Sequence, residues 1–192
     1  MPPVKKFAKE EIINVAYNIA KYEGIESINA RRIAKELGSS VQPIFHNFSN
    51  MEELNESVTK KIYKKYEEYM LSGINEKNGY KNTGLSYIRF AKDYPKFFKI
   101  LFMQKTDLTF NNFISEDDVD EKIIKAGQKL TGLSYEEQKE FHKKVAIFTH
   151  GLACLVATKT IEFTDQEIDI MLGDTVIEML KGLKIKGEDI NE

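Results

Sequence analysis

The apolar residues of this chain recur at spacings of three and four, which is the period of an amphipathic α-helix. Between residues 6 and 22 the apolar positions are Phe7, Ile12, Val15, Ala16, Ile19 and Ala20. Gly24 follows this pattern directly and is expected to end the first helix as its C-cap. Similar spacing recurs along most of the chain, and regular strand alternation is hard to find. We therefore predict an all-α fold of about nine helices.

Two short helices, over residues 30–37 and 41–48, are predicted next, with a tight turn at Gly38, Ser39 and Ser40. Asn29 is a suitable N-cap for the first of them, and Gly38 suits a turn that needs a positive φ. The second helix has a small apolar face of Val41, Ile44 and Phe48, surrounded by hydrogen-bonding side chains. Such a helix is poor core material, but it is suited to reading base edges in a DNA major groove.

Longer helices are predicted for the rest of the chain. Ser49 and Glu52 fit a capping box that opens a helix over 51–74, and Ser134 and Glu137 fit a second box. Thr164 or Asp165 is expected to cap the last helix. The remaining predicted elements are a linker over 75–83, helices over 84–93 and 95–103, a polar loop over 106–118, and helices over 116–130, 134–161 and 165–183.

Composition places the chain among soluble globular proteins. Hydrophobic residues make up 42% and charged residues 30%, and no apolar run approaches the ~18 residues that a membrane span requires. No apolar stretch follows the lysines near the N-terminus, so a signal peptide is not expected. A single cysteine, Cys154, excludes an intramolecular disulfide framework. We expect a cytoplasmic protein with no membrane partner.

The charge is unevenly distributed. Residues 1–65 hold 11 lysines and arginines against 8 acidic residues, a formal charge of +3, whereas the rest of the chain holds 17 against 22, a charge of −5. This asymmetry is typical of a DNA-binding head on an acidic body, although solvated helices often show similar differences.

A series of residues between Ser27 and Leu54 carries a family resemblance: Ile33, Ala34, Leu37, Gly38, Ser40, Phe48 and Leu54. In this order and spacing they resemble the DNA-binding segment of TetR-type transcriptional regulators, and the match covers residues 7–54. The sequence departs from the family pattern at two positions. Phe45 stands where the family often has a tyrosine that contacts phosphate, and Met51 stands where it commonly has lysine.

The resemblance implies two domains. Residues 1–50 would form a three-helix, helix-turn-helix DNA-binding domain, and residues 51–192 a larger helical domain for ligand binding and dimerisation. The implied function is that of a ligand-responsive repressor that binds a palindromic double-stranded DNA operator as a homodimer. No enzymatic activity and no cofactor are expected, because no phosphate-binding loop and no nucleophile constellation is found.

The expected DNA contacts follow from position in this segment: Asn29, Arg31, Ser39, Ser40, Gln42, Pro43, Phe45 and His46. Gln42 is the best candidate for direct base reading, because its amide can bond both N6 and N7 of adenine. Arg31, or in its place Arg32, is expected to reach DNA from the preceding helix.

The C-terminal part is expected to hold a partly apolar small-molecule effector, since ligand cavities are mostly apolar with a few polar groups. The candidate ligand-binding residues are Tyr87, Phe90, Phe98, Phe102, Phe148, His150 and Cys154. Ordinary helix core is the alternative role for most of them. His150 and Cys154 are four residues apart and share a helix face, but a metal site needs more ligands, so no metal is expected.

The last two helices are too apolar to stand alone, and the resemblance implies that two such helices from each subunit form a four-helix dimer interface. Two function classes remain as alternatives. An enzyme is disfavoured because His46, His142 and His150 are scattered without metal-binding spacing. The other alternative is a helical interaction or ligand-binding protein that does not bind DNA.

Overall fold

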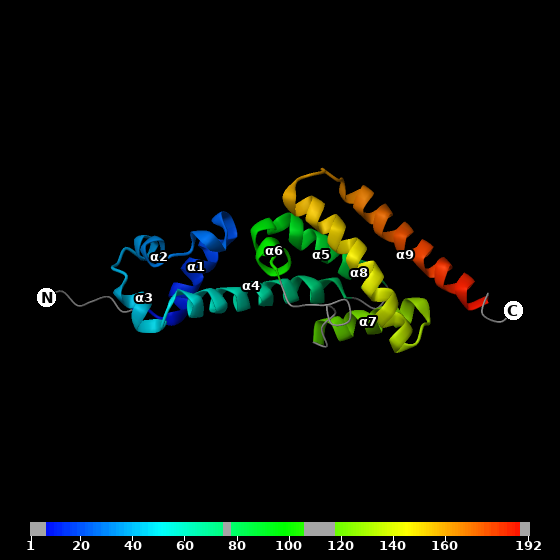
Figure 1. Ribbon diagram of the computed structural model, residues 1–192, viewed down its shortest axis with the longest axis horizontal. Helices are drawn as coiled ribbons and strands as arrows, with labels where there is room; N and C mark the ends of the chain where they lie inside the picture. The colour runs from blue at the N-terminus through cyan, green and yellow to red at the C-terminus, as the bar shows by residue number, and fades with distance from the viewer. Residues whose placement is uncertain (1–6, 75–77, 106–117, 189–192) are drawn as a thin grey trace. The chain divides into compact units, whose positions relative to one another are not determined.

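The computed structural model describes residues 7–74, 78–105 and 118–188 (Figure 1). Across these ranges it contains α-helices, one short 3-10 helix and no strand, which confirms the predicted all-α class. The elements are α1 (Lys9–Glu23), η1 (Ile25–Ser27), α2 (Ala30–Leu37), α3 (Gln42–Asn47), α4 (Met51–Gly73), α5 (Gly79–Asp93), α6 (Pro95–Phe102), α7 (Asp118–Thr131), α8 (Tyr135–Thr158) and α9 (Asp165–Glu188).

The caps of the later helices were largely predictable. Ser134 and Glu137 form the expected capping box at the start of α8, and Thr164, rather than Asp165, caps α9 through Glu167. The capping box predicted at α4 from Ser49 and Glu52 is wrong, because Asn50 caps this helix. Asn50 Oδ1 accepts a hydrogen bond from the backbone N–H of Glu53 at 2.9 Å. The Glu53 carboxylate accepts a hydrogen bond from the backbone N–H of Ser49 at 2.8 Å and pairs with Lys9 of α1 at 2.7 Å.

The linker predicted over residues 75–83 is largely wrong. Residues 75–77 lie outside the described part of the chain, and α5 already begins at Gly79. Tyr80 is 5% exposed and its hydroxyl lies 3.0 Å from Nδ1 of His142, so tertiary packing overrides a composition rich in Asn, Gly and Lys. The polar loop expected over 106–118 also lies outside the described residues, apart from Asp118, where α7 begins.

The chain divides into two compact units. Unit 1 comprises residues 1–66 and 94–105, and unit 2 comprises residues 67–93 and 106–192. The division falls inside α4, and α6 packs against α1 in unit 1. These packing units therefore differ from the domains predicted on either side of residue 50, and the functional roles of those domains stay predictions.

The core of unit 1 is built from one face of each N-terminal helix. Ile12, Ile33, Ile44 and Leu54 have no exposed surface. α6 adds aromatic contacts, since the rings of Tyr17 and Phe97 lie 4.7 Å apart between centroids. This shared core holds α2 and α3 in place and leaves their other faces at the surface.

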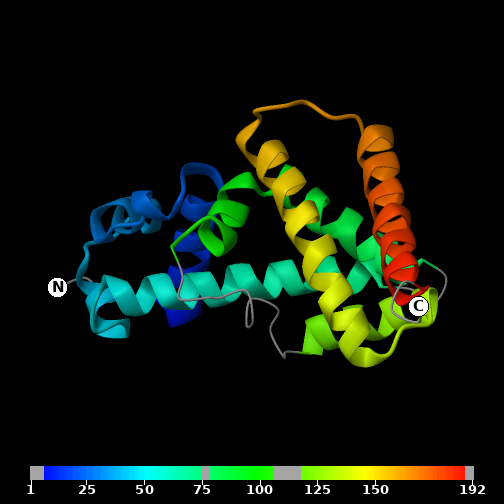
Figure 2. The same ribbon diagram turned by 45° about the vertical axis from the view of Figure 1, so that its right-hand side comes forward.

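In unit 2, α5 packs against α7, α8 and α9, and α8 and α9 lie side by side (Figures 1 and 2). Two tyrosine–histidine hydrogen bonds join α5 to α8. Tyr80 pairs with His142, and about two helical turns further along both helices Tyr87 pairs with His150 at 2.9 Å. These bonds satisfy polar groups inside an otherwise apolar contact, so they help to fix the register of the two helices.

We predict that acid destabilises unit 2 through His142. Burial penalises the charged imidazolium and lowers the pKa of His142 to about 4. The folded state therefore binds fewer protons than the unfolded state, so this stability is complete above the ordinary pKa of about 6.5 and is lost as the pH falls towards 4. The free energy of unfolding should fall by about 2 kcal/mol between pH 7 and pH 5.

Urea unfolding at the two pH values measures this loss, with His142→Gln as the control. Glutamine can still pair with the Tyr80 hydroxyl but does not titrate. The variant should lose distinctly less stability on acidification, and an identical loss in both proteins would contradict the assignment.

Candidate DNA-binding surface and ligand pocket

The two short helices of unit 1 are joined by a tight, well-defined turn. Asn29 caps α2, because its Oδ1 accepts a hydrogen bond from the backbone N–H of Arg32 at 2.9 Å. Gly38 ends α2 in the left-handed conformation, with φ at 60°, as predicted from the sequence. The N–H of Ser39 then bonds back to the carbonyl of Ala34 at 2.9 Å. The chain thereby turns sharply into α3.

α3 is anchored on one side and open on the other. Pro43 and Ile44 are buried, and Asn47 Nδ2 donates to the carbonyls of Phe7 and Pro43 at 3.2 and 2.8 Å. On the opposite side Gln42, Phe45 and His46 are exposed, and half of the Phe45 surface is accessible. The helix thus presents an amide, an aromatic ring and an imidazole on one outward face.

The residues predicted to contact DNA do not all share this exposure. Arg31, Ser40, Gln42, Phe45 and His46 are exposed, and Ser39 is half-buried. Asn29 is exposed, but its side chain is used in the cap of α2. Pro43 is buried in the second position of α3, where its ring suits the helix start, and it has little surface to offer a partner.

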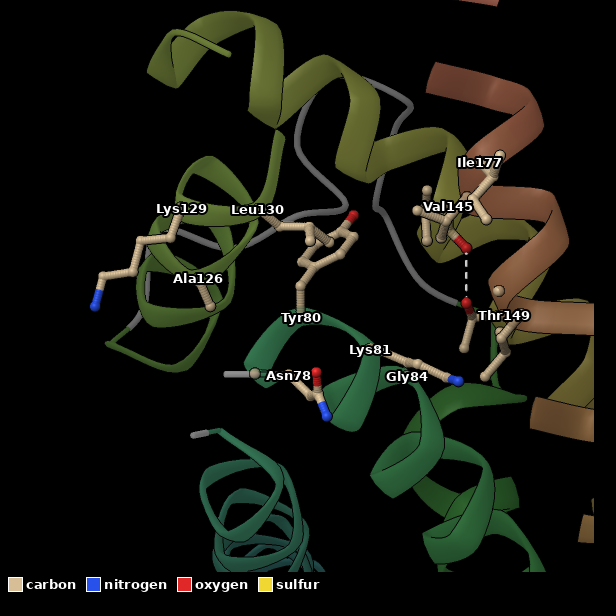
Figure 3. Close-up of a pocket in the computed structure, with 14 residues that line it drawn as sticks. Asn78, Tyr80, Lys81, Gly84, Ala126, Lys129, Leu130, Val145, Thr149 and Ile177 are labelled. Atoms are coloured by element: carbon tan, nitrogen blue, oxygen red, sulfur yellow. Dashed lines mark hydrogen bonds between the residues drawn. The ribbon is translucent and has the colours of Figure 1, made fainter. Parts of the chain in front are cut away.

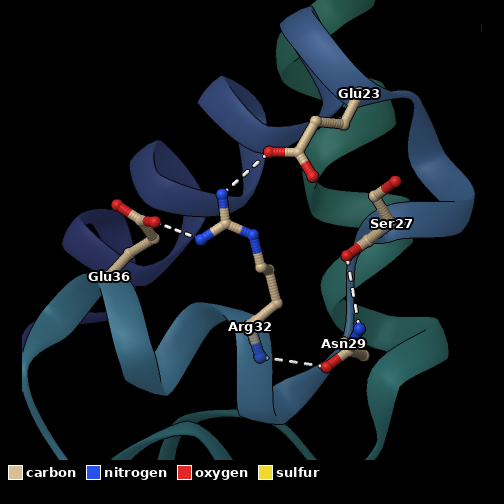
Figure 4. Close-up of polar contacts among 5 residues, drawn as sticks. All are labelled: Glu23, Ser27, Asn29, Arg32 and Glu36. Carbon is tan, nitrogen blue, oxygen red and sulfur yellow. Dashed lines mark hydrogen bonds and ion pairs between the residues drawn. The ribbon is translucent and has the colours of Figure 1, made fainter.

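Arg31 and Arg32 have different environments, although they are neighbours in α2. The guanidinium of Arg32 bridges Glu23 of α1, at 2.8 Å, and Glu36 of α2 (Figure 4). Hydrogen bonds to these carboxylates raise the pKa of Arg32 above its ordinary value. Arg31 is exposed and forms no side-chain hydrogen bond or ion pair with the described residues. Arg31 is therefore the arginine left available to a partner.

Lys9 is a supporting residue that sequence reasoning missed. Its ammonium pairs with Glu53 at 2.7 Å and lies 4.6 Å from the centre of the Phe48 ring, so it connects α1 to the segment that follows α3. The ion pair, together with the N–H of Ser49, lowers the pKa of Glu53 to about 2. Spacing alone did not reveal this contact, because the two residues are 44 positions apart.

Unit 2 contains a pocket of about 400 Å³ (Figure 3). Four helices line it: α5, α7, α8 and α9. Its walls include Tyr80, Gly84, Leu130, Val145, Thr149 and Leu172. Figure 3 shows Tyr80 and Leu130 on one side, and Val145, Thr149 and Ile177 on the other. The volume lies within the range of about 300–1,000 Å³ that is usual for small-molecule sites.

None of the seven predicted ligand-binding residues lines this pocket. Tyr87, His150 and Cys154 do come together, because His150 Nδ1 meets the Tyr87 hydroxyl and Nε2 lies 3.4 Å from Cys154 Sγ. Phe90 is core, with no exposed surface. The remaining three are not gathered with them: Phe148 is half-buried on α8, and Phe98 and Phe102 belong to unit 1.

Glycines in helical segments were the feature of the sequence that could have indicated this pocket. Gly84 and Gly173 line it from within α5 and α9, where glycine is unfavourable, and Gly79 lines it from the first position of α5. Of the five predicted aromatic residues, Phe90 and Phe98 are buried in the core, and Tyr87, Phe102 and Phe148 are half-buried. Within the described ranges, no group of three or more His, Cys, Asp or Glu side chains is placed to hold a metal ion.

Comparison with solved structures shows that the fold of this chain is shared by another protein. No protein-family model matches the chain, and no curated protein matches it. The chain is similar to the crystal structure of a "putative transcriptional regulator" from Streptomyces coelicolor A3(2), with 13% sequence identity and a TM-score of 0.52. The match covers 95% of this chain and 99% of the other. No helix in the described ranges is both long and apolar enough to cross a membrane. At this identity the likeness establishes a shared all-helical fold over nearly the whole chain.

Proposed function

We propose that this chain is a homodimeric DNA-binding transcriptional regulator that represses transcription until a small molecule binds. The outward face of α3 is the observation that carries the proposal. Gln42, Phe45 and His46 are exposed there, while Ile44 and Asn47 hold the helix to the unit. The protein of similar fold from Streptomyces coelicolor A3(2) is described as a "putative transcriptional regulator", which supports the proposal.

Each exposed side chain of this region has a role that suits DNA. Gln42 would read adenine through its amide, and the ring of Phe45 would contact a thymine methyl group. Ser40, His46 and Arg31 would bind phosphates, which fixes position and supplies much of the affinity. Because Phe45 lacks a hydroxyl, its contribution would be apolar.

Exposed isoleucines on the last two helices of unit 2 support the dimer. Ile147 of α8 is 53% exposed, and Ile170 and Ile177 of α9 are 50% and 51% exposed. Gly151 lies one turn after Ile147, and a Cβ added there would meet no atom within 4 Å. A second copy that packed against α8 and α9 would bury these isoleucines, with Gly151 permitting close helix approach. A two-fold dimer also matches a palindromic operator.

Regulation would follow from a shift between two conformational states. A ligand lowers the affinity for DNA if it binds more tightly to the state in which the two α3 helices of the dimer do not fit the DNA grooves. Linkage requires that DNA lowers the affinity for ligand by the same factor.

The test is fluorescence anisotropy with labelled DNA from upstream of the protein's own gene, at two salt concentrations. We expect binding that weakens steeply with salt, because phosphate contacts release counterions. If the protein binds neither this DNA nor competitor DNA at low salt, the alternative of a helical ligand-binding protein without DNA is favoured.

The two adjacent arginines give a matched prediction. Arg31→Ala should weaken DNA binding about equally for all sequences and lower the salt slope by about one per half-site. Arg32→Ala should leave the salt slope unchanged, since Arg32 is already paired with Glu23 and Glu36. Anisotropy titrations at three salt concentrations measure both slopes, and equal losses in the two variants would refute the assignment of Arg31.

A further inference from the structure

We propose that the pocket between α5, α7, α8 and α9 binds a small amphipathic carboxylate, with its apolar part inside and its anionic head at Lys81. The inference that a ligand binds depends on the pocket alone, whereas the inference that this ligand is the effector rests on the proposed function. Its lining includes none of the seven ligand-binding residues predicted from the sequence.

The interior of the pocket suits an apolar chain. Tyr80, Leu130, Val145 and Leu172 contribute mostly hydrocarbon surface. The Thr149 hydroxyl already donates to the carbonyl of Val145 at 2.8 Å, and the Tyr80 hydroxyl is paired with His142. The polar groups of the wall are therefore largely satisfied by the protein, which favours an apolar occupant.

Two glycines line the pocket at positions where the single chain has room for a side chain. A Cβ at Gly173 would meet no atom within 4 Å, and one at Gly84 would meet only the Leu172 side chain, at 3.5 Å. Alanine would fit at both positions and is favoured over glycine within a helix. Contact between the helices of one chain therefore does not require glycine at these positions, and the space is available to an occupant.

The charges around the pocket favour an anion. Of the described residues that line it, Lys81 and Lys129 are cationic and none is acidic. Lys81 bridges to Asp169 of α9 at 2.7 Å, with 41% of its side chain still exposed. A ligand carboxylate would compete with Asp169 for this ammonium. Lys129 is exposed and makes no ion pair with the described residues.

Three probes with the same tail separate the contributions of tail and head. Isothermal titration of the full-length protein without DNA would compare decanoate, decan-1-ol and decyltrimethylammonium. We expect decanoate to bind about tenfold more tightly than decan-1-ol, because its head forms a charged hydrogen bond. The cationic probe should bind most weakly. Equal affinities for the three probes would overturn the anionic-head assignment.

Variants locate the site. Lys81→Gln should lower the affinity for decanoate about tenfold and leave that for decan-1-ol unchanged. Asp169→Asn frees Lys81 and should raise the affinity for decanoate. Gly84→Phe fills the pocket and should abolish binding of both, whereas Gly84→Ala should retain it. Gly173→Leu replaces Gly84→Phe if circular dichroism shows that the latter is unfolded. Undiminished binding in a folded pocket-filling variant would overturn the site.

The anisotropy assay separates this site from the proposed function. Decanoate binding by a protein that binds no DNA would overturn the regulator and leave the site standing. Salt-dependent DNA binding by a protein that ignores all three probes would overturn the site alone.

Discussion

Replacing Ile147 and Ile170 together by glutamate is expected to convert the protein from a dimer into a monomer. Both side chains are about half exposed in the single chain, and we place both in the dimer interface. Each would occur twice in a two-fold interface, so the double variant introduces four carboxylates. An unpaired buried charge costs about 3–5 kcal/mol, so the dissociation constant of the dimer should rise at least about a thousandfold.

Sedimentation velocity over a range of protein concentrations measures this change. The control is Tyr22→Glu, which places the same charge on an exposed aromatic residue of α1, 70% exposed and in unit 1. The control should remain dimeric. The proposed interface fails if the double variant is folded and still dimeric, or if the unaltered protein is a monomer at all concentrations.

Gln42→Ala is expected to cause the largest loss of sequence-specific DNA binding of any single α3 substitution. A bidentate amide contact is worth about 1–3 kcal/mol of discrimination at one base pair. Because a dimer makes the contact in both half-sites, the total loss would be about 2–6 kcal/mol, or about 30-fold to 10⁴-fold in affinity. Binding to non-specific DNA should change little, since that binding depends on phosphate contacts.

The matched control for this loss is Asn18→Ala, which removes an exposed amide from α1 of the same unit. Anisotropy titrations with the operator and with a scrambled sequence give the specificity ratio of each variant. Only Gln42→Ala should lower that ratio. A parallel loss on both DNA sequences would assign Gln42 to the backbone rather than to a base.

Local signals in the sequence predicted much of the fold. The bounds of α2 were predicted to the residue, because Asn29 is a strong N-cap and Gly38 a strong C-cap at either end of an apolar face. The cap of α8 followed in the same way from Ser134 and Glu137. The start of α5 did not, since the burial of Tyr80 against a distant helix decides it.

The candidate sites were predictable only in part. The exposed surface of α3 was predictable because this short helix has many polar side chains and only a small apolar face. That composition can be read from neighbouring residues in the sequence. The difference between Arg31 and Arg32 depends on Glu23, which belongs to another helix. The pocket requires the packing of four helices, and its most informative residues, such as Gly84, are notable for the side chain they lack. Periodicity does not report such features.

Selection of binding sites from a pool of random double-stranded DNA tests the central claim most directly. Successive rounds of selection with the unaltered protein, followed by sequencing, give the preferred motif without assuming any operator sequence. We predict two inverted half-sites centred about one helical turn, or a multiple of it, apart. At one base pair of each half-site the preference should weaken when Gln42→Ala is used instead. Recovery of unenriched DNA, or of a single site without inverted symmetry, would contradict the account.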